Sequence, residues 1–201
     1  MIKPSKIKNL RNINDKYLTP YSLIQQLLDI KKDIPKNALI FEPCCSNEKT
    51  IVNTLIKNGY NNIEYNIFDE TNPKTDFLNF NEDKKYEYII TNTPYGRVVK
   101  QFINKMKKIA IKQVIALYTF NILSGTDNYD NIWLDENYKL KEIYLFTRPP
   151  WLLDTIREDG KYKTGINGYA WFVWENGYTG EPVLRHIDNN RFVLSKKDKS
   201  V

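Results

Sequence analysis

Short runs of apolar and β-branched residues recur along the chain, and between them apolar residues return every three or four positions. The first pattern is typical of buried strands, and the second is typical of helices with one apolar face. The predicted strands span 38–41, 63–68, 88–91, 114–118, 140–146 and 169–174, with a further strand-like run after residue 183. The predicted helices lie at about 20–30, 50–57 and 98–110.

The order of these elements predicts an α/β fold. Strands and helices alternate through the first 118 residues, and strands predominate afterwards. This order favours a doubly wound, mostly parallel sheet that ends in an antiparallel hairpin. No internal repeat or linker divides the 201 residues, so we expect one domain with a basic arm at 1–14 and a polar tail at 188–201.

One turn lies where open α/β sheets bind their ligands. The predicted strand 88–91 stops at Asn92, and the segment Thr93-Pro94-Tyr95-Gly96 separates it from the next helix. Ligands of such sheets bind in the crevice beyond the carboxyl ends of the strands. Asn and Pro are also common turn residues, so an ordinary structural turn is the alternative.

Composition narrows the chemistry that the chain can perform. The formal net charge of +6 favours a polyanionic partner such as nucleic acid. With one histidine and two adjacent cysteines, Cys44 and Cys45, we expect neither a metal site nor Ser-His chemistry. No stretch approaches the ~18 apolar residues that cross a membrane, and the first residues show no apolar signal region, so we expect a location in the cytoplasm of a cell or host.

The turn Asn92-Thr93-Pro94-Tyr95 resembles the Asn-Pro-Pro-Tyr motif of S-adenosylmethionine-dependent amino-methyltransferases, chiefly the DNA adenine-N6 enzymes. The resemblance implies that the Asn92 side-chain oxygen and the Thr93 carbonyl accept hydrogen bonds from the target amino group, while Tyr95 stacks on the base. Thr93 stands where the family has proline. Because Thr93 precedes Pro94, its backbone is still biased toward an extended conformation.

The segment Tyr17-x-Thr19-Pro20 has two interpretations. It comes just before the first predicted helix, where Thr19 is a plausible N-cap and Pro20 suits the first helical position. It also resembles the family's N-terminal motif, which closes over the cofactor. The resemblance makes Tyr17, Thr19 and Pro20 candidate cofactor-binding residues.

The segment from Glu42 to Glu48 resembles the family's cofactor loop, Glu-Pro-x-Ala-Gly-x-Gly. Glycine in that loop lets the backbone approach the methionine moiety, and the following helix N-terminus favours its carboxylate. The resemblance implies cofactor contacts for Glu42, Pro43, Cys44 and Ser46. Ser46 and Glu48 occupy the glycine positions, which adds bulk and negative charge, so we expect weak cofactor affinity.

Two later positions resemble the family's remaining cofactor contacts. Asn66 matches the acidic residue that holds the ribose hydroxyls, and Asp69 and Glu70 are possible substitutes for it. Asp76 and Phe77 resemble the pair that contacts the adenine amino group and packs against the adenine ring. These matches keep the family order along the chain.

The carboxyl-terminal half resembles small phage-type adenine methyltransferases, through Arg148-Pro-Pro-Trp151 and the aromatic segment 169–174. The resemblance covers about residues 15–187 and implies a Rossmann-like class I methyltransferase fold of seven strands, with the last strand inserted beside the fifth. Our candidates for DNA contacts are Arg97, Arg148, Trp151, Lys161 and Lys163.

The function expected from this resemblance is methyl transfer from S-adenosylmethionine to N6 of adenine in DNA. Such an adenine must leave the base stack to reach a pocket. Two alternatives remain open: a non-catalytic nucleic-acid-binding protein that keeps the fold, or a methyltransferase that acts on RNA or on a protein glutamine amide. The sequence leaves the oligomeric state open.

Overall fold

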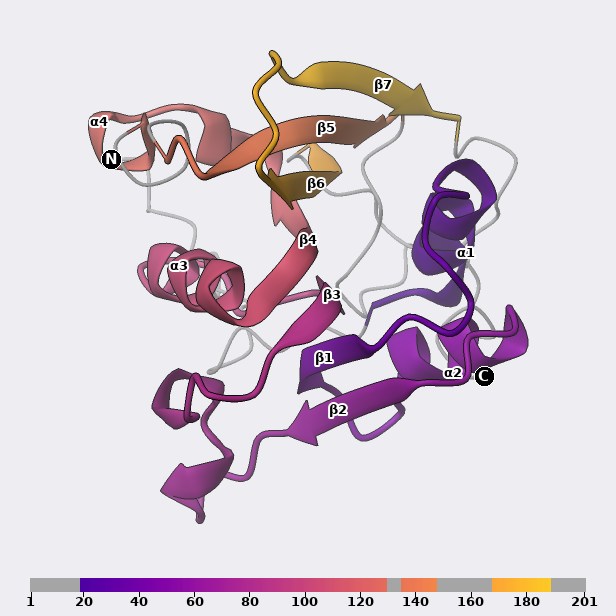
Figure 1. Ribbon diagram of the computed structural model, residues 1–201, viewed down its shortest axis with the longest axis vertical. Coiled ribbons are helices and arrows are strands. Elements are labelled where there is room, and N and C mark those ends of the chain that lie inside the picture. Colours follow the sequence, from indigo (N-terminus) through magenta and orange to yellow (C-terminus); the bar gives the residue numbers. More distant parts are fainter. Residues whose placement is uncertain (1–18, 130–134, 148–167, 189–201) are drawn as a thin grey trace, which may run out of the picture.

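The protein folds around a single seven-stranded sheet (Figure 1). The structure, a computed structural model, describes residues 19–129, 135–147 and 168–188. The strands are β1 (Ile40–Cys45), β2 (Ile63–Ile67), β3 (Tyr86–Thr91), β4 (Ala110–Thr119), β5 (Tyr138–Phe146), β6 (Tyr169–Asn176) and β7 (Val183–Ile187). The helices are α1 (Tyr21–Ile30), α2 (Thr50–Lys57), α3 (Val99–Ile109) and the short α4 (Thr126–Asn128), with 3-10 turns η1 (Pro73–Thr75), η2 (Phe77–Asn79) and η3 (Phe120–Leu123).

The strand order is β2-β1-β3-β4-β6-β5-β7, and β6 runs antiparallel to both of its neighbours. The other pairs in the sheet are parallel. This confirms the predicted α/β class, the mostly parallel sheet and the antiparallel hairpin. The last strand, β7, lies beside the fifth, β5, as expected, but at the sheet edge; the strand inserted between two others is β6, so that detail of the expectation is wrong.

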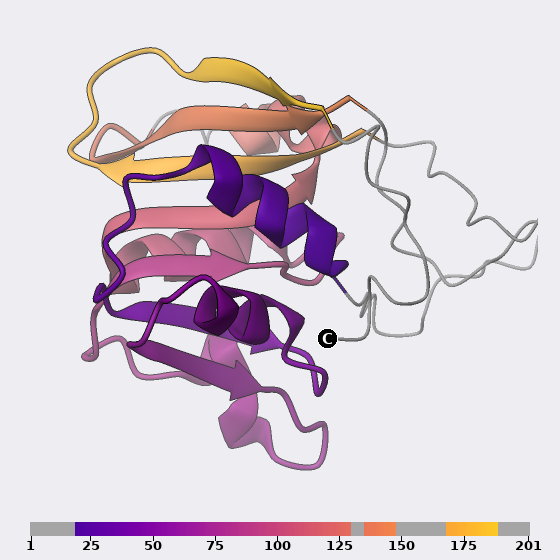
Figure 2. The same ribbon diagram turned by 90° about the vertical axis from the view of Figure 1, so that its right-hand side faces the viewer.

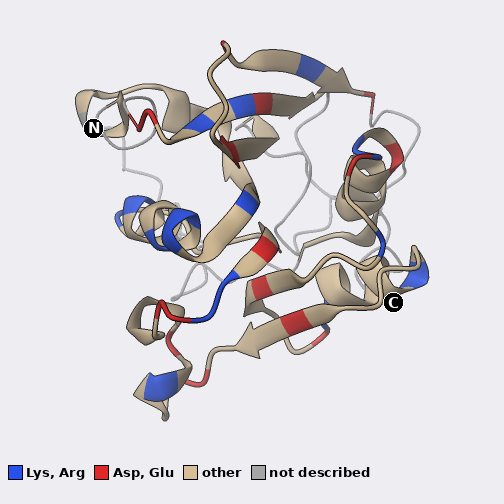
Figure 3. Cartoon of the chain, in the orientation of Figure 1, with Lys and Arg blue, Asp and Glu red and all other residues tan. Residues whose placement is uncertain are grey.

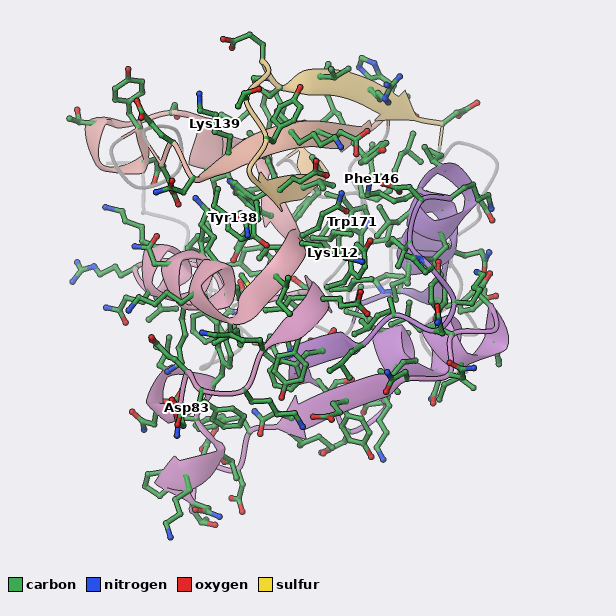
Figure 4. The ribbon with its side chains drawn as sticks, in the orientation of Figure 1. Asp83, Lys112, Tyr138, Lys139, Phe146 and Trp171 are labelled. Atoms are coloured by element: carbon green, nitrogen blue, oxygen red, sulfur yellow. The ribbon has the colours of Figure 1, made fainter. Side chains whose placement is uncertain are left out.

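Helices cover both faces of the sheet. Helices α1 and α2 pack on one face and α3 on the other, as Figures 1 and 2 show. Phe146 and Trp171 point toward α1, whereas Tyr138 lies on the α3 side (Figure 4). The indole nitrogen of Trp171 donates to the carbonyl oxygen of Leu23 in α1 at 3.1 Å, which ties this helix to the sheet centre.

Local apolar patterns account for most of the element boundaries. Helix α2 spans the predicted 50–57, and Gly59 ends it with a positive φ of 84°. The prediction of Thr19 as an N-cap is wrong, because Pro20 holds that position and no side chain caps α1. Within the described ranges, no helix is both long and apolar enough to cross a membrane.

Candidate active site

A pocket opens at the carboxyl ends of β1 and β3. It holds about 270 Å³ of empty space, part of which is open to solvent. Its lining consists of Thr19, Glu42, Cys44, Cys45, Ser46, Thr50, Ile51 and Asn92. Five of these were candidates from the sequence, and the structure brings them together from three separate segments. Cys45, Thr50 and Ile51 were not among the residues predicted from the sequence, although Cys45 lies inside the predicted cofactor loop.

The side-chain amide of Asn92 is held at both of its ends. Its Nδ2 donates to the Thr19 hydroxyl at 2.9 Å, and the Tyr95 hydroxyl donates to its Oδ1 at 2.8 Å. Thr19 is buried, whereas Asn92 is half-buried at the pocket lining. These two bonds orient the amide, with Oδ1 directed to the tyrosine and Nδ2 to the threonine.

The rest of the turn faces the sheet rather than the pocket. Thr93 is buried, and its hydroxyl is hydrogen-bonded to that of Tyr118 at 2.7 Å. The ring of Tyr95 packs edge-on against Tyr118 and Tyr169, with centroid distances of 6.4 and 6.0 Å. Pro94 lies between these two anchored residues and is half-buried. The turn is therefore fixed to β4 and to the start of β6.

Glu42 carries a carboxyl group with no exposure to solvent. Its Oε1 accepts from the Cys44 amide at 3.0 Å and from the Thr91 hydroxyl at 2.5 Å. Among the described residues, Oε2 has no hydrogen-bond partner. Burial raises the pKa of Glu42 to about 8, although the bonds from Thr91 and Cys44 oppose the shift. The side chain is therefore mostly protonated at neutral pH.

The loop after β1 has no glycine, and its one left-handed residue among those described is Lys49. Among the described non-glycine residues, only Lys49 has a positive φ, of 52°, so Ser46 and Glu48 do not adopt the left-handed conformation. The side chain of Glu48 is exposed, which takes its charge away from the buried pocket wall. Lys49 Nζ lies 2.7 Å from the Tyr65 hydroxyl. The left-handed residue thus falls one position after the second expected glycine.

Helix α2 points its first turn at the same pocket. No side chain caps its N-terminus, and Thr50 and Ile51 line the pocket. Within the described part of the chain, the buried Thr50 hydroxyl has no hydrogen-bond partner. An uncapped helix start presents free backbone N–H groups and a partial positive charge, which suit an anion.

The two cysteines of the pocket are thiols at neutral pH. Burial and the nearby Glu42 raise the pKa of Cys45 to about 12, and burial and Glu42 also raise the pKa of Cys44. The Cys45 thiol donates to the Ser46 carbonyl oxygen at 3.3 Å. Among the described residues, no group of three or more His, Cys, Asp or Glu side chains could hold a metal ion.

The candidates for the ribose and adenine contacts lie outside the pocket lining. Asn66 Nδ2 donates to the carbonyl oxygens of Pro43 and Thr75 at 3.1 and 2.9 Å. Asp76 accepts from the Leu78 amide at 2.9 Å and caps η2. Phe77 is buried in the core on the α3 side of the sheet. Their contacts with a cofactor, like those of the buried Pro20, stay predictions.

Arg97 is the one candidate for DNA contacts within the described residues, and it is exposed between β3 and α3. Tyr17, Arg148, Trp151, Lys161 and Lys163 lie outside those residues. Figure 3 shows the lysines along α3, of which Lys107 is buried and Lys108 is exposed. Both are paired locally, since Lys107 lies 3.0 Å from Asp135 and Lys108 lies 3.3 Å from Glu82.

Comparison with known proteins gives no match at the level of sequence: no family model and no curated protein matches this chain. The fold, however, is similar to that of solved structures. One is a putative RNA methyltransferase from Pyrococcus horikoshii, with a TM-score of 0.57 and 12% identity over 82% of this chain and 89% of that chain.

Two others come from type I restriction-modification proteins. The M protein of the type I restriction enzyme EcoKI matches with a TM-score of 0.55 and 12% identity over 91% of this chain and 50% of that chain. A chain of a type I R-M system matches with a TM-score of 0.56 and 12% identity over 84% of this chain and 44% of that chain. This chain therefore spans about half the length of the restriction-modification proteins that it matches. These likenesses show that the chain has the fold of these methyltransferases.

Proposed function

We propose that the protein transfers a methyl group from S-adenosylmethionine to the N6 amino group of an adenine in DNA. The observation that carries the proposal is the placement of Asn92. Its amide lies at the carboxyl end of β3, lines the pocket and is oriented by Thr19 and Tyr95. The turn sequence, which resembles that of amino-methyltransferases, and the methyltransferase fold support the proposal.

The pocket residues fit the amino-acid end of this cofactor. Glu42 Oε2 and the Thr50 hydroxyl are buried polar atoms that lack partners among the described residues, and both residues line the pocket. A carboxylate suits the uncapped start of α2. An ammonium group beside Glu42 would favour the ionised form of its carboxyl, which can then accept the hydrogen bond that Oε2 lacks. When bound, S-adenosylmethionine supplies an electrophilic methyl group on its sulfonium.

Two polar acceptors of the turn would orient the target amino group. Asn92 Oδ1 has two lone pairs, so it accepts a hydrogen bond from the amino group beside the one from Tyr95. The Thr93 carbonyl oxygen accepts a second bond from the amino group. These bonds direct the nitrogen lone pair toward the methyl donor, so orientation and preorganised polar groups supply the catalysis. No strong base is needed, because the amino proton leaves after positive charge has developed on the nitrogen.

An adenine in a duplex would have to be flipped out to reach this turn. The ring of Tyr95, half-buried beside Asn92, is the candidate for stacking on the flipped base. Arg97 is exposed next to this turn and is a candidate for a phosphate contact. The net charge of +6 agrees with a polyanionic acceptor.

A second candidate function is methylation of an amino group in RNA. The observation that favours it is the likeness to a putative RNA methyltransferase whose length this chain nearly matches, with coverage of 82% of this chain and 89% of that chain. The same turn can present its acceptors to an adenine in either nucleic acid.

The test is methyl transfer from radiolabelled S-adenosylmethionine to four acceptors: DNA with adenine, DNA without adenine, RNA of the first sequence, and a glutamine-containing protein. We expect label only in adenine-containing DNA, recovered as N6-methyladenine after digestion to nucleosides. Label in RNA alone would favour the second candidate, and label in the protein would point to a glutamine amide. Calorimetry that detects no binding of S-adenosylmethionine would leave the non-catalytic alternative.

A further inference from the structure

Thr93 and Tyr118 continue the register of β3 and β4 beyond the point where backbone pairing stops. The last paired residues are Thr91 and Ala116, and each of the two hydroxyl-bearing residues lies two positions further along its strand. Their hydroxyl oxygens are 2.7 Å apart, a normal distance for a hydrogen bond between hydroxyls. The hydrogen bond between the Thr93 and Tyr118 hydroxyls therefore links the turn to β4 beyond the last backbone pair of β3 and β4.

Tyr118 is a rigid anchor for this bond. Its side chain is fully buried, and its ring packs against Phe172 and Trp174 of β6 at centroid distances of 6.4 and 6.3 Å. A close-packed aromatic cluster of this kind keeps its members in single orientations. The ring of Tyr118 is thus held by β6, which pairs with β4 on the edge away from β3.

The same tyrosine also contacts the other end of the turn. Its ring lies 6.4 Å from that of Tyr95 at an interplanar angle of 88°, in an edge-to-face arrangement. Tyr95 in turn donates its hydroxyl to Asn92 Oδ1 at 2.8 Å. One buried side chain therefore holds both residues that flank Pro94, and through Tyr95 it reaches the amide proposed to accept the target amino group.

We propose that Tyr118 is a positioning residue of the methyl-transfer site, which fixes the Thr93 carbonyl and the Asn92 amide through the Thr93 hydroxyl and the Tyr95 ring. The inference rests on the proposed function. It also gives a physical reason for threonine where the family has proline, because a buried hydrogen bond supplies the rigidity that the missing ring would have given.

A purely structural role is the competing explanation, since a buried tyrosine hydroxyl needs a partner wherever it lies. The two roles separate in a double-mutant cycle with Thr93→Val and Tyr118→Phe. Thr93→Val leaves the buried Tyr118 hydroxyl without its partner, and Tyr118→Phe leaves the Thr93 hydroxyl with only the Pro94 carbonyl oxygen, at 3.3 Å. Both single variants should lower the melting temperature, the first by more. The double variant removes both hydroxyls, and replacing both partners by apolar groups can be nearly neutral for stability.

If Tyr118 positions the catalytic turn, the changes in kcat across these variants should not follow the changes in melting temperature. We expect kcat to fall roughly tenfold in each single variant and to stay equally low in the double variant, although its melting temperature recovers. The KM for S-adenosylmethionine should change less than about twofold, since neither residue lines the pocket. Thr93→Ser keeps the hydroxyl and should recover most of the rate that Thr93→Val loses.

Recovery of kcat together with melting temperature in the double variant would overturn the proposal. A second measurement covers the case in which the wild-type protein methylates none of the four acceptors, which would refute the proposed function instead. The side-chain amide signals of Asn92, read by NMR after specific labelling, should shift in Tyr118→Phe and in the double variant. Unchanged Asn92 signals would show that Tyr118 does not position this amide.

Discussion

Thr19 accepts a hydrogen bond from Asn92 at 2.9 Å across 73 residues of sequence. Thr19 lies two residues before α1 and Asn92 directly follows β3, so the segment before α1 and the turn line the same pocket. Thr19 lies one position before the N-cap residue Pro20, and its hydroxyl is directed to the turn rather than to the start of α1. Local sequence rules predict that the Thr19 side chain caps a helix, but in the structure it orients the side-chain amide of Asn92.

Replacing Thr19 should slow methyl transfer without unfolding the protein. Thr19→Val removes the acceptor for Asn92 Nδ2 at nearly constant volume, and one such bond is worth roughly 0.5–1.5 kcal/mol. We expect kcat to fall about three- to tenfold in steady-state assays. Thr19→Ser retains the hydroxyl and should restore most of the rate; equal loss in both variants would contradict the role of this bond.

Asn92→Ala should abolish transfer while the fold persists. The variant removes a preorganised acceptor at the reacting centre, and the loss of one such group typically costs about two to three orders of magnitude in rate. Its melting temperature should stay close to wild type, because Asn92 is half-buried at the end of a strand. Binding of S-adenosylmethionine should persist, because Glu42 and Thr50, the pocket residues proposed for its amino-acid end, are unchanged. Asn104→Ala, on the exposed side of α3, is the matched control. A variant that keeps most of the wild-type rate would exclude Asn92 from the chemistry.

Stability should decrease as pH rises through the range in which Glu42 titrates. In the unfolded chain this carboxyl loses its proton near its ordinary value of 4.5, whereas burial raises its pKa to about 8 in the folded protein. Between these values the folded state holds one more proton, so higher pH favours unfolding. Urea denaturation from pH 5 to pH 9 should show this decline, which levels off above about pH 8.

The matched variant for this prediction is Glu42→Gln, which resembles the protonated carboxyl and cannot ionise. Its stability should vary less with pH than that of wild type, and the gap between the two proteins should widen toward pH 8 in favour of the glutamine. Glu48→Gln, at an exposed position of the same loop, should leave the wild-type profile in place. Parallel profiles for wild type and Glu42→Gln would show that Glu42 does not retain its proton.

Glycine at position 49 should be more stable than alanine. Lys49 has φ 52° and ψ 37°, a left-handed conformation that costs side chains other than glycine about 1 kcal/mol. Lys49→Gly and Lys49→Ala both lose the contact with Tyr65, so their difference in unfolding free energy isolates the backbone effect. The same pair at Asn104, an exposed position inside α3, should give the opposite order, because glycine weakens a helix interior. Alanine equal to glycine at position 49 would argue against the left-handed turn.

DNA affinity should fall steeply as salt rises, since phosphate contacts release bound cations. Arg97→Ala should weaken binding and reduce the slope of log affinity against log salt by about one. Lys108 is already paired with Glu82 at 3.3 Å, so Lys108→Ala should leave the slope unchanged. Filter binding at several salt concentrations measures both, and a slope insensitive to Arg97→Ala would remove this residue from the contact surface.

Patterns local to one segment predicted much of this structure. The strand before Asn92, the helix 50–57 and the loop beginning at Glu42 follow from apolar spacing and turn residues, which act over a few positions. The rule that ligands bind at the carboxyl ends of parallel strands predicted the position of Asn92. Thr19 and Glu42 were candidates through the family resemblance, and the pocket brings the three residues together.

Features that depend on distant partners could not be predicted in this way. The bond between Thr93 and Tyr118 joins residues on different strands, and no local pattern marks either hydroxyl as a partner. Lys49 adopts the left-handed conformation, whereas Ser46 and Glu48, which stand where the family has glycine, do not. Residue type alone does not mark Lys49 for this conformation. The insertion of β6 depends on pairing with β4 across a long stretch of chain.

The position of β6 between β4 and β5 also determines the order in which the sheet can form during synthesis on the ribosome. Strand β5 is synthesised before β6, yet β6 lies between β5 and β4, so the sheet cannot grow in the order of synthesis. Until β6 has emerged, one edge of β4 has no partner, although its residues Val114 to Tyr118 are fully buried in the finished protein. An unpaired apolar edge invites pairing with other chains. Truncated or stalled chains that end before residue 169 should therefore aggregate, whereas release of the full chain lets β6 close that edge.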